Sequence, residues 1–341
     1  MNQTEQQKPI AGILVTMVAP FENHIANGGE KLFGNAGSIK RRPDGKVYVS
    51  GQMQRHVFFS SIDRLNSLDA DRGNTFVSNG DGITQEIERD IRADLGGFMY
   101  PSKGNYSGRR ISPLSVTPAV ALSDSKVGRD LLVRIKVDPQ ADSQTQAFAT
   151  KEYSESDKMC MNFHLDISTV GASRVYDYVK VYDYKGGLNI GSKFIKHITE
   201  EEKRRRISLF LDATRLMNDY ANQARNAVCG EPERVLIVFD TILSRKASRY
   251  FTVSEQEQKN ILKELDRRGV VYFMGDDSSE ESVADAYERA LAYLKKANLV
   301  DFATNDKPMT FAETFGSTTE EDNPKKKTQR SKTKKTSSSE D

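Results

Sequence analysis

The sequence predicts an α+β fold with a ferredoxin-like core that is enlarged by long insertions. Short apolar runs of strand length alternate with segments whose apolar residues recur at helical spacing. The polar stretches between them are far longer than ordinary connections, whose median length is about 4–6 residues. Long excursions from a compact core commonly carry function, so the insertions are the first place to look for a binding surface.

The individual elements follow from apolar patterning and from helix-start residues. The predicted strands are 10–19, 46–49, 131–137, 158–170, 234–241 and 270–274. The predicted helices are 51–66, a polar segment near 84–95, 199–228, 254–268 and 279–297. The apolar run 114–122 is interrupted by Pro118, and residues 138–157 are polar and typical of a loop. Without the insertions, this order fits the core of an RNA-recognition motif.

Two of the helices have specific start signals. Ser50 is expected to cap the helix over 51–66, because serine accepts a hydrogen bond from the first turn. Phe58, Ile62 and Leu65 give that helix a buried face. Thr199 followed by Glu202 matches a capping box and predicts the start of the next long helix.

Composition excludes several classes of protein. The 341 residues carry 50 basic and 48 acidic side chains, and no apolar run is long enough for a membrane span. Cys160 and Cys229 are far apart and are expected to be buried, reduced thiols, which favours a cytoplasmic location. The last segment, 317–341, contains seven Lys or Arg and five Asp or Glu but no large apolar residue, so we expect a disordered, Lys-rich tail.

Motifs for catalysis or metal binding are missing from the sequence. The four histidines are scattered, and neither GxSxG nor HExxH occurs. Asp276 and Asp277 follow a predicted strand and are explained better by a turn that caps a helix than by metal binding. We therefore expect a protein that is not an enzyme and that needs no metal or other cofactor.

The most informative segment is 34–56, GNAGSIKRRPDGKVYVSGQMQRH. It combines five basic residues with a single acid, Asp44, while the whole chain carries only +2. Backbone N–H groups at a helix start, with Ser50 beside them, suit a phosphate. On the helix, Gln52, Arg55 and His56 share one polar face. The segment therefore predicts a polyanion site formed by Lys40, Arg41, Arg42, Ser50, Gln52, Arg55 and His56, with a plain solvated surface as the alternative.

Three further segments are basic. In YDYVKVYDYK (176–185) the tyrosines alternate as on a strand, so Tyr176, Tyr178 and Lys180 suit base stacking beside a phosphate, or else a packed hairpin arm. The loop 103–110 offers Lys103, Arg109 and Arg110, and residues 245–249 are also basic; either could contact nucleic acid or a neighbouring subunit. The run 203–206 is better explained by helix ion pairs with the three glutamates before it.

The chain resembles a known family in three of these segments: GNAGSIKRRPDGKVYVSGQMQRH, LSVTPAVAL and MCMNFHLDISTVG. They are similar to the CRISPR-associated backbone subunit of type I Cascade, and within it to the DevR-type autoregulator group typical of subtype I-B. The resemblance implies a palm with an RNA-recognition-motif-like core, inserted fingers and a thumb. Mapped here, the palm is 8–66, 158–171 and 207–300, the fingers are 67–157, and the thumb is 172–206.

The resemblance also implies partners and a mechanism. Copies would stack side by side along a guide RNA, the crRNA, and meet target DNA through that guide, together with other Cascade subunits. The palm residues of 40–56 would grip the guide backbone, the thumb would cover a flipped base, and the loop 103–110 would face RNA or target DNA. Two alternatives stay open: a metal-dependent ribonuclease subunit of a type III-like effector, and a transcriptional autoregulator.

Overall fold

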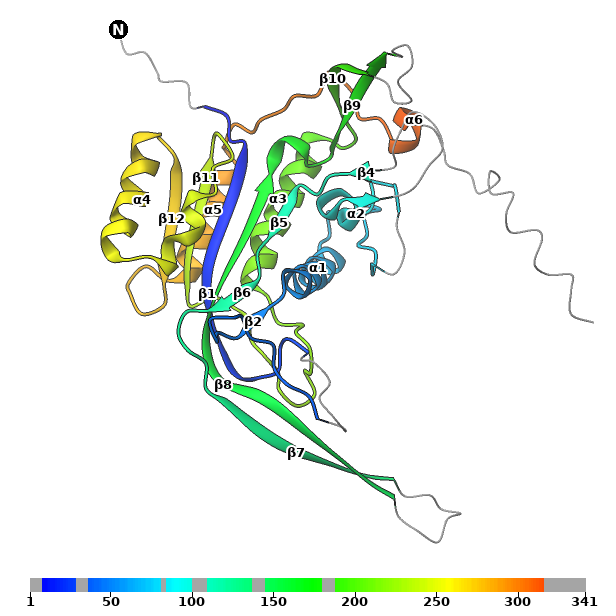
Figure 1. Cartoon of the computed structure of the whole chain (residues 1–341). Helices are drawn as coiled ribbons and strands as arrows, with labels where there is room; N and C mark the ends of the chain where they lie inside the picture. Colours follow the sequence, from blue (N-terminus) through cyan, green and yellow to red (C-terminus); the bar gives the residue numbers. More distant parts are fainter. Residues whose placement is uncertain are drawn as a thin grey trace, which may run out of the picture.

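One antiparallel sheet organises the protein (Figure 1). The computed structural model describes residues 8–28, 36–80, 84–99, 109–136, 145–179 and 188–315. The sheet has the strand order β12-β11-β1-β8-β6-β2, and β5 and β7 also pair with β8. Its strands are β1 Gly12–His24, β2 Tyr48–Val49, β5 Leu114–Val116, β6 Ala119–Ala121, β7 Val127–Lys136, β8 Thr145–Asp166, β11 Arg234–Asp240 and β12 Val271–Asp276. The expected α+β class is confirmed.

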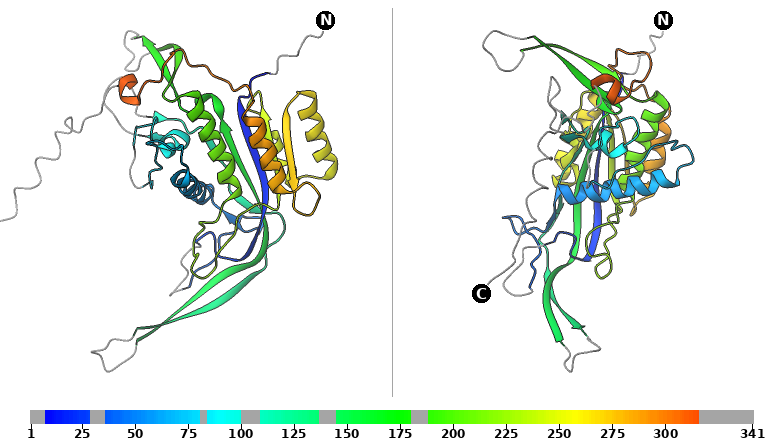
Figure 2. Two further views of the ribbon diagram at one scale, coloured as in Figure 1. Left: turned by 180° about the vertical axis from the view of Figure 1, so that it is seen from behind. Right: turned by 90° about the vertical axis from the view of Figure 1, so that its right-hand side faces the viewer.

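The two faces of the sheet are covered by different helices. Along β1, Ile13, Val15 and Met17 point into the main core, which α1 (Gly51–Leu68), α3 (Glu200–Arg215) and α5 (Val283–Leu294) close. Leu14 points the other way, into a smaller core under the 3-10 helix η2 (Lys246–Thr252) and α4 (Glu255–Arg267). Seen edge-on, α1, α3 and α5 lie on one side of the sheet and α4 on the other (Figure 2). The period-two alternation of a strand produces this division.

Serine and threonine caps set where the helices begin. Ser50 accepts a hydrogen bond from Met53 N at the start of α1, and Ser254 and Ser282 form complete capping boxes on α4 and α5. Thr199 caps α3 through Glu202 N. The Glu202 carboxylate, however, binds arginines of its own helix, so only half of the expected capping box is found there.

Two β-hairpins project from opposite ends of the sheet (Figure 1). One is the pair β9 (Ala172–Val179) and β10 (Leu188–Lys196), and the other is the long ribbon of β7 and the first half of β8. Shorter elements lie beside the first hairpin: α2 (Ile91–Gly96), β3 (Phe98–Met99), β4 (Arg109–Arg110), the 3-10 helix η1 (Ile167–Thr169) and α6 (Phe311–Phe315).

Several expected elements have different bounds. Residues 145–157, expected as a loop, belong to β8, and the helix near 84–95 is only α2, because Asp90 caps it by accepting from Arg92 N. The helix expected to reach 228 ends at Arg215. Cys160 is buried as expected, but Cys229 is exposed, so that part of the expectation is wrong.

The palm, fingers and thumb boundaries stay predictions. β8 continues through the boundary at 157/158, and α3 continues through the boundary at 206/207. The Lys-rich tail, 317–341, lies outside the described residues. Within the described part of the chain, no helix is both long enough and apolar enough to cross a membrane.

Candidate nucleic-acid interface

The basic loop before α1 is a tight turn that exposes its cations. Gly45 N donates to Arg42 O at 2.9 Å, and Gly45 takes a φ of +84°, a conformation that glycine adopts without strain. Lys40, Arg41 and Arg42 are all exposed, and Arg42 makes a half-exposed ion pair with Asp44 at 3.3 Å. An exposed pair of this kind is weak, so the loop remains available to an anion.

Asn27, which the sequence analysis missed, fixes this loop to the end of β1. Its side chain is buried; Nδ2 donates to Lys40 O at 3.0 Å and to Tyr48 O, and Oδ1 accepts from Lys40 N at 3.3 Å. The other side of the loop is tied to β8, where Gly37 N donates to Thr150 O at 2.9 Å. The backbone of the loop is therefore held while the side chain of Lys40 extends outward.

The polar face of α1 is smaller than the sequence predicts. Gln52 and His56 are exposed on it. Arg55 is half-buried; it donates to Gly96 O at 2.5 Å and lies over the ring of Phe59, with its guanidinium carbon 5.6 Å from the centroid. Burial lowers the pKa of Arg55. Arg55 stays a predicted RNA contact, and in the structure its guanidinium joins α1 to α2.

Arg110 is buried, whereas the sequence predicts that it contacts nucleic acid or a neighbouring subunit. Its side chain is 5% exposed and pairs with Asp94 at 2.5 Å, and its remaining N–H groups donate to Thr169 O, Ala172 O and Ser173 Oγ. A guanidinium with this many buried partners does not face nucleic acid. Lys103 lies outside the described residues, and of Arg109 only its place in β4 is described.

Asp94 stands at the centre of the buried charges around Arg110. Its second oxygen pairs with Arg206 of α3 at 2.7 Å, and Gly171 N donates to its first at 2.9 Å. Arg206 is fully buried and also donates to Ile87 O and Glu202. This cluster joins α2, β4 and α3 to the start of β9.

The basic run 203–206 is structural, and Glu200 and Glu202 pair with its arginines as the ion-pair interpretation predicts. Lys203 Nζ donates to Val300 O at 2.9 Å, and Arg204 donates to Leu294 O at 2.7 Å while pairing with Glu200. Arg205 pairs with Asp69 at 2.8 Å, joining α3 to the end of α1. Lys203 and Arg204 thus bind the chain from Leu294 to Val300, whereas Arg205 and Arg206 bind the end of α1 and the region of α2.

The hairpin β9–β10 is partly described. Tyr176 is 38% exposed, and Arg174 Cζ lies 5.1 Å from the centroid of its ring. Tyr178 lies on β9, but its side chain is not among those described, and Lys180 lies outside the described residues. The expectation of a strand-borne tyrosine on a hairpin arm is confirmed at Tyr176.

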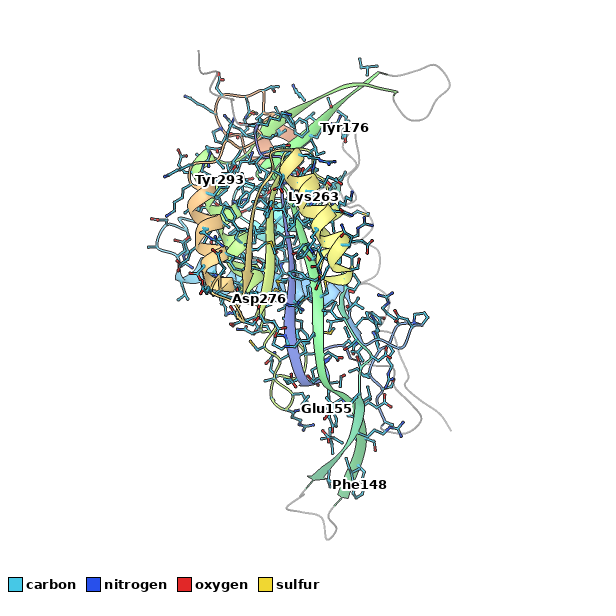
Figure 3. All side chains as sticks on the ribbon, turned by 90° about the vertical axis from the view of Figure 1, so that its left-hand side faces the viewer. Phe148, Glu155, Tyr176, Lys263, Asp276 and Tyr293 are labelled. Atoms are coloured by element: carbon cyan, nitrogen blue, oxygen red, sulfur yellow. The ribbon has the colours of Figure 1, made fainter. Side chains whose placement is uncertain are left out.

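The basic loop and this hairpin lie far apart. At one end of β1, Gly12 pairs with Asp166, shortly before β9 begins; at the other, His24 pairs with Ser154, shortly before Asn27. A 13-residue strand separates them by about 40 Å. The basic loop and the β9–β10 hairpin are therefore two separate surfaces. Figure 3 shows Tyr176 at the hairpin end and Phe148 at the other.

Other titratable groups serve packing. His24 Nε2 lies 2.7 Å from Asp157 Oδ2 in a buried pair that joins β1 to β8. Asp276 and Asp277 accept hydrogen bonds from the turn before α5, which confirms the turn interpretation. Among the described residues, no group of three or more His, Cys, Asp or Glu could hold a metal ion.

At the remaining basic segment, residues 245–249, Lys246 pairs with Glu264, and Arg245 and Arg249 are exposed.

Comparison with known proteins identifies the family. A family model described as CRISPR-associated negative auto-regulator DevR/Csa2 matches residues 34–228. The chain belongs to this family. The matched part begins at the basic segment, includes both hairpins and ends after α3.

Two solved structures are also similar to this DevR/Csa2-family chain. A chain of a CRISPR RNA-guided surveillance complex has a TM-score of 0.49 at 10% identity, covering 82% of this chain and 98% of that one. A chain of such a complex in a pre-nicking state has a TM-score of 0.48 at 10% identity, covering 83% and 99%. No curated protein matches the sequence.

Proposed function

We propose that this DevR/Csa2-family protein is a non-catalytic backbone subunit that binds guide RNA in a type I Cascade complex. In this role, copies lie side by side along the crRNA, with other Cascade subunits, and reach target DNA through the guide, in antiviral defence or guided transposition. The strand order β11-β1-β8-β6, with α1 after β1 and α3 after β8, supports a ferredoxin-like palm.

One observation carries the proposal: the exposed cations Lys40 and Arg41 on a backbone that Asn27 fixes. A subunit that accepts any guide must recognise backbone and shape, not sequence. Exposed cations on a fixed loop, next to the N-terminus of α1, meet that requirement, because phosphate is the same at every nucleotide.

The test is salt-dependent RNA binding by a Lys40→Ala/Arg41→Ala variant. Removing two phosphate contacts is expected to weaken binding to RNAs of unrelated sequence equally and to reduce the slope of log K against log salt by about 1–2. Arg55 is left unchanged, because its substitution would disturb the contact with Gly96.

A matched control removes the same charge elsewhere. Lys259→Ala/Lys263→Ala on α4 deletes two exposed cations on the opposite side of the sheet and is expected to leave RNA affinity nearly unchanged. Equal affinity of the Lys40/Arg41 variant and wild type would refute the proposal. Sequence-specific binding of duplex DNA without RNA would favour an autoregulator, and guide-directed cutting of RNA with magnesium would favour a nuclease.

A further inference from the structure

The segment that follows α5, residues 298–311, crosses the base of the β9–β10 hairpin; we call it the C-terminal strap (Figure 1, orange). It starts beside β1, where Ile10 N donates to Asn298 O at 2.7 Å and Val300 N donates to Ile10 O at 2.9 Å. The strap lies outside residues 34–228, which the family model matches. Its role therefore has to be inferred from its own contacts.

The strap adds a third, short strand to the base of the hairpin. Ala303 forms a parallel bridge with Phe194 of β10, and Thr304 N donates to Phe194 O at 2.9 Å. Asn305 binds the backbone of Lys196 twice, because its Oδ1 accepts from the N–H at 2.9 Å and its Nδ2 donates to the carbonyl at 3.0 Å. An isolated two-stranded hairpin is only marginally stable in water, so these contacts stabilise the base of β9–β10.

The end of the strap is anchored to the region of α2. His197 Nδ1 donates to Met309 O at 2.7 Å, and Phe311 N donates to the Glu88 carboxylate at 3.2 Å. The buried Phe311 ring lies against Phe98, with centroids 5.6 Å apart. Glu88 and Phe98 stand on either side of α2 in the sequence. The strap thus joins the hairpin base to the segment 88–98.

The other edge of the hairpin base is held by the buried charge cluster. Gly171, which takes a φ of +63°, donates its N–H to both oxygens of Asp94 at 2.9 and 3.1 Å. Arg110 donates to Ala172 O at 2.8 Å, at the first residue of β9. The base is therefore bonded along both edges, at β9 by the cluster and at β10 by the strap.

We infer that the C-terminal strap is a positioning element that fixes the direction of the β9–β10 hairpin relative to the sheet, with Asn305 as its main contact. This inference goes beyond the proposed function and does not depend on RNA binding. Strand β9 has 8 residues and is about 26 Å long, so a rotation of about 10° at its base moves its far end by about 5 Å. The strap therefore determines where the end of the hairpin lies before any partner binds, which is preorganisation.

The test measures the distance between the hairpin and the sheet in the full-length protein by double electron–electron resonance. Nitroxide labels are attached at Ile190→Cys, which is 65% exposed on β10, and at Lys263→Cys, which is exposed on α4. The exposed Cys229 is replaced in a Cys229→Ser background, and the buried Cys160 is left in place. Unsubstituted at Asn305, the protein should give a single narrow distance distribution.

Asn305→Ala is expected to shift and broaden this distribution, because both bonds to Lys196 are lost. Asn305→Asp keeps an oxygen that accepts from the Lys196 N–H, so it should restore part of the narrow distribution. Asp306→Ala is the matched control, since Asp306 is the next residue of the strap and is exposed; it should leave the distribution as it is without the substitution.

A second pair of labels separates hairpin direction from general unfolding. Asp63→Cys on α1 and Lys263→Cys on α4 both lie on helices that pack on the sheet, and their distance should be the same with and without Asn305→Ala. A change in both pairs would show that the strap supports the whole fold, which overturns the inference. An unchanged distance between positions 190 and 263 in Asn305→Ala would overturn it as well, and in either case the proposed function would stand.

Discussion

Asp94 is the residue on which the buried charge cluster depends. It has no exposed surface and meets two guanidinium groups, those of Arg110 and Arg206, at 2.5 and 2.7 Å. A buried ion pair is not itself strongly stabilising, but removing one partner leaves uncompensated charge in a low-dielectric site. Here the loss of one carboxylate would leave two buried guanidinium groups without their shared counter-charge.

Asp94→Ala is therefore expected to lower the free energy of unfolding by about 3–5 kcal/mol. Chemical denaturation followed by circular dichroism measures this. Asp44→Ala, which breaks the exposed Arg42–Asp44 pair, is the matched control and should cost about 0–1 kcal/mol. Similar losses for both variants would contradict a special role for the buried cluster.

At the scale of elements, Ser50 at the N-terminus of α1 has a structural role that can be tested separately from its predicted role in RNA binding. Ser50 Oγ accepts from Met53 N at 3.2 Å, so the residue predicted to contact RNA is already a helix cap. Ser50→Ala should cost about 1 kcal/mol of stability through loss of the cap. Thermal unfolding checks this value.

Ser50→Asp tests the phosphate separately. Aspartate caps helices as well as serine, so the stability should stay near that of wild type. Its negative charge, placed beside the helix start, should repel a bound phosphate and lower RNA affinity severalfold in low salt. Unchanged RNA affinity in this variant would mean that no phosphate lies at the start of α1.

The elements that the sequence predicted well are those with one buried face. The core strands 10–19 and 234–241 and the helix cap at Ser50 have strong local signals, and the structure contains them. The start of β8 was missed because it belongs to a ribbon away from the core: Phe148 is 52% exposed. Without a buried face, a strand has no apolar alternation to detect.

The candidate site was predicted less well, for a related reason. A basic residue has the same appearance in sequence whether it is exposed or neutralised by a distant partner. Lys40 and Arg41 are exposed, whereas Arg110 finds Asp94 16 residues away. Asn27 carries no sequence signal at all, because its role depends on the position of Lys40 in space.

At the scale of the whole molecule, the sheet sets the distance between the basic loop and the β9–β10 hairpin. β1 holds the basic loop at one end and, through its pairing with β8, the β9–β10 hairpin at the other. A nucleic-acid strand that contacts both would have to run along the sheet for several nucleotides. Under the proposed function, phosphate contacts spaced along this length would be compatible with recognition that does not depend on sequence.

The pH dependence of global stability is the last prediction. Burial, the largest cause, lowers the pKa of His197 to about 4, although its hydrogen bond to Met309 O opposes this; burial also lowers that of His164 to about 4. In the unfolded chain both titrate near 6.5. The unfolded state therefore binds more protons below pH 6.5, and stability falls as the pH falls from about 7 towards 4. Each histidine should contribute on the order of 2 kcal/mol between pH 7.5 and 5.

His197→Asn isolates one of the two contributions. The Asn amide can still donate to Met309 O but does not titrate, so the fall in unfolding free energy between pH 7.5 and 5 should shrink by the share of one histidine. Asp157 affects stability in a lower pH range. Burial raises its pKa, but hydrogen bonds from His24 and Ser125 outweigh this, so the net pKa is lowered. Its protonation therefore destabilises the fold only as the pH falls through about 4 and below. If the stability of His197→Asn falls between pH 7.5 and 5 as steeply as that of wild type, His197 is not held neutral beside Met309.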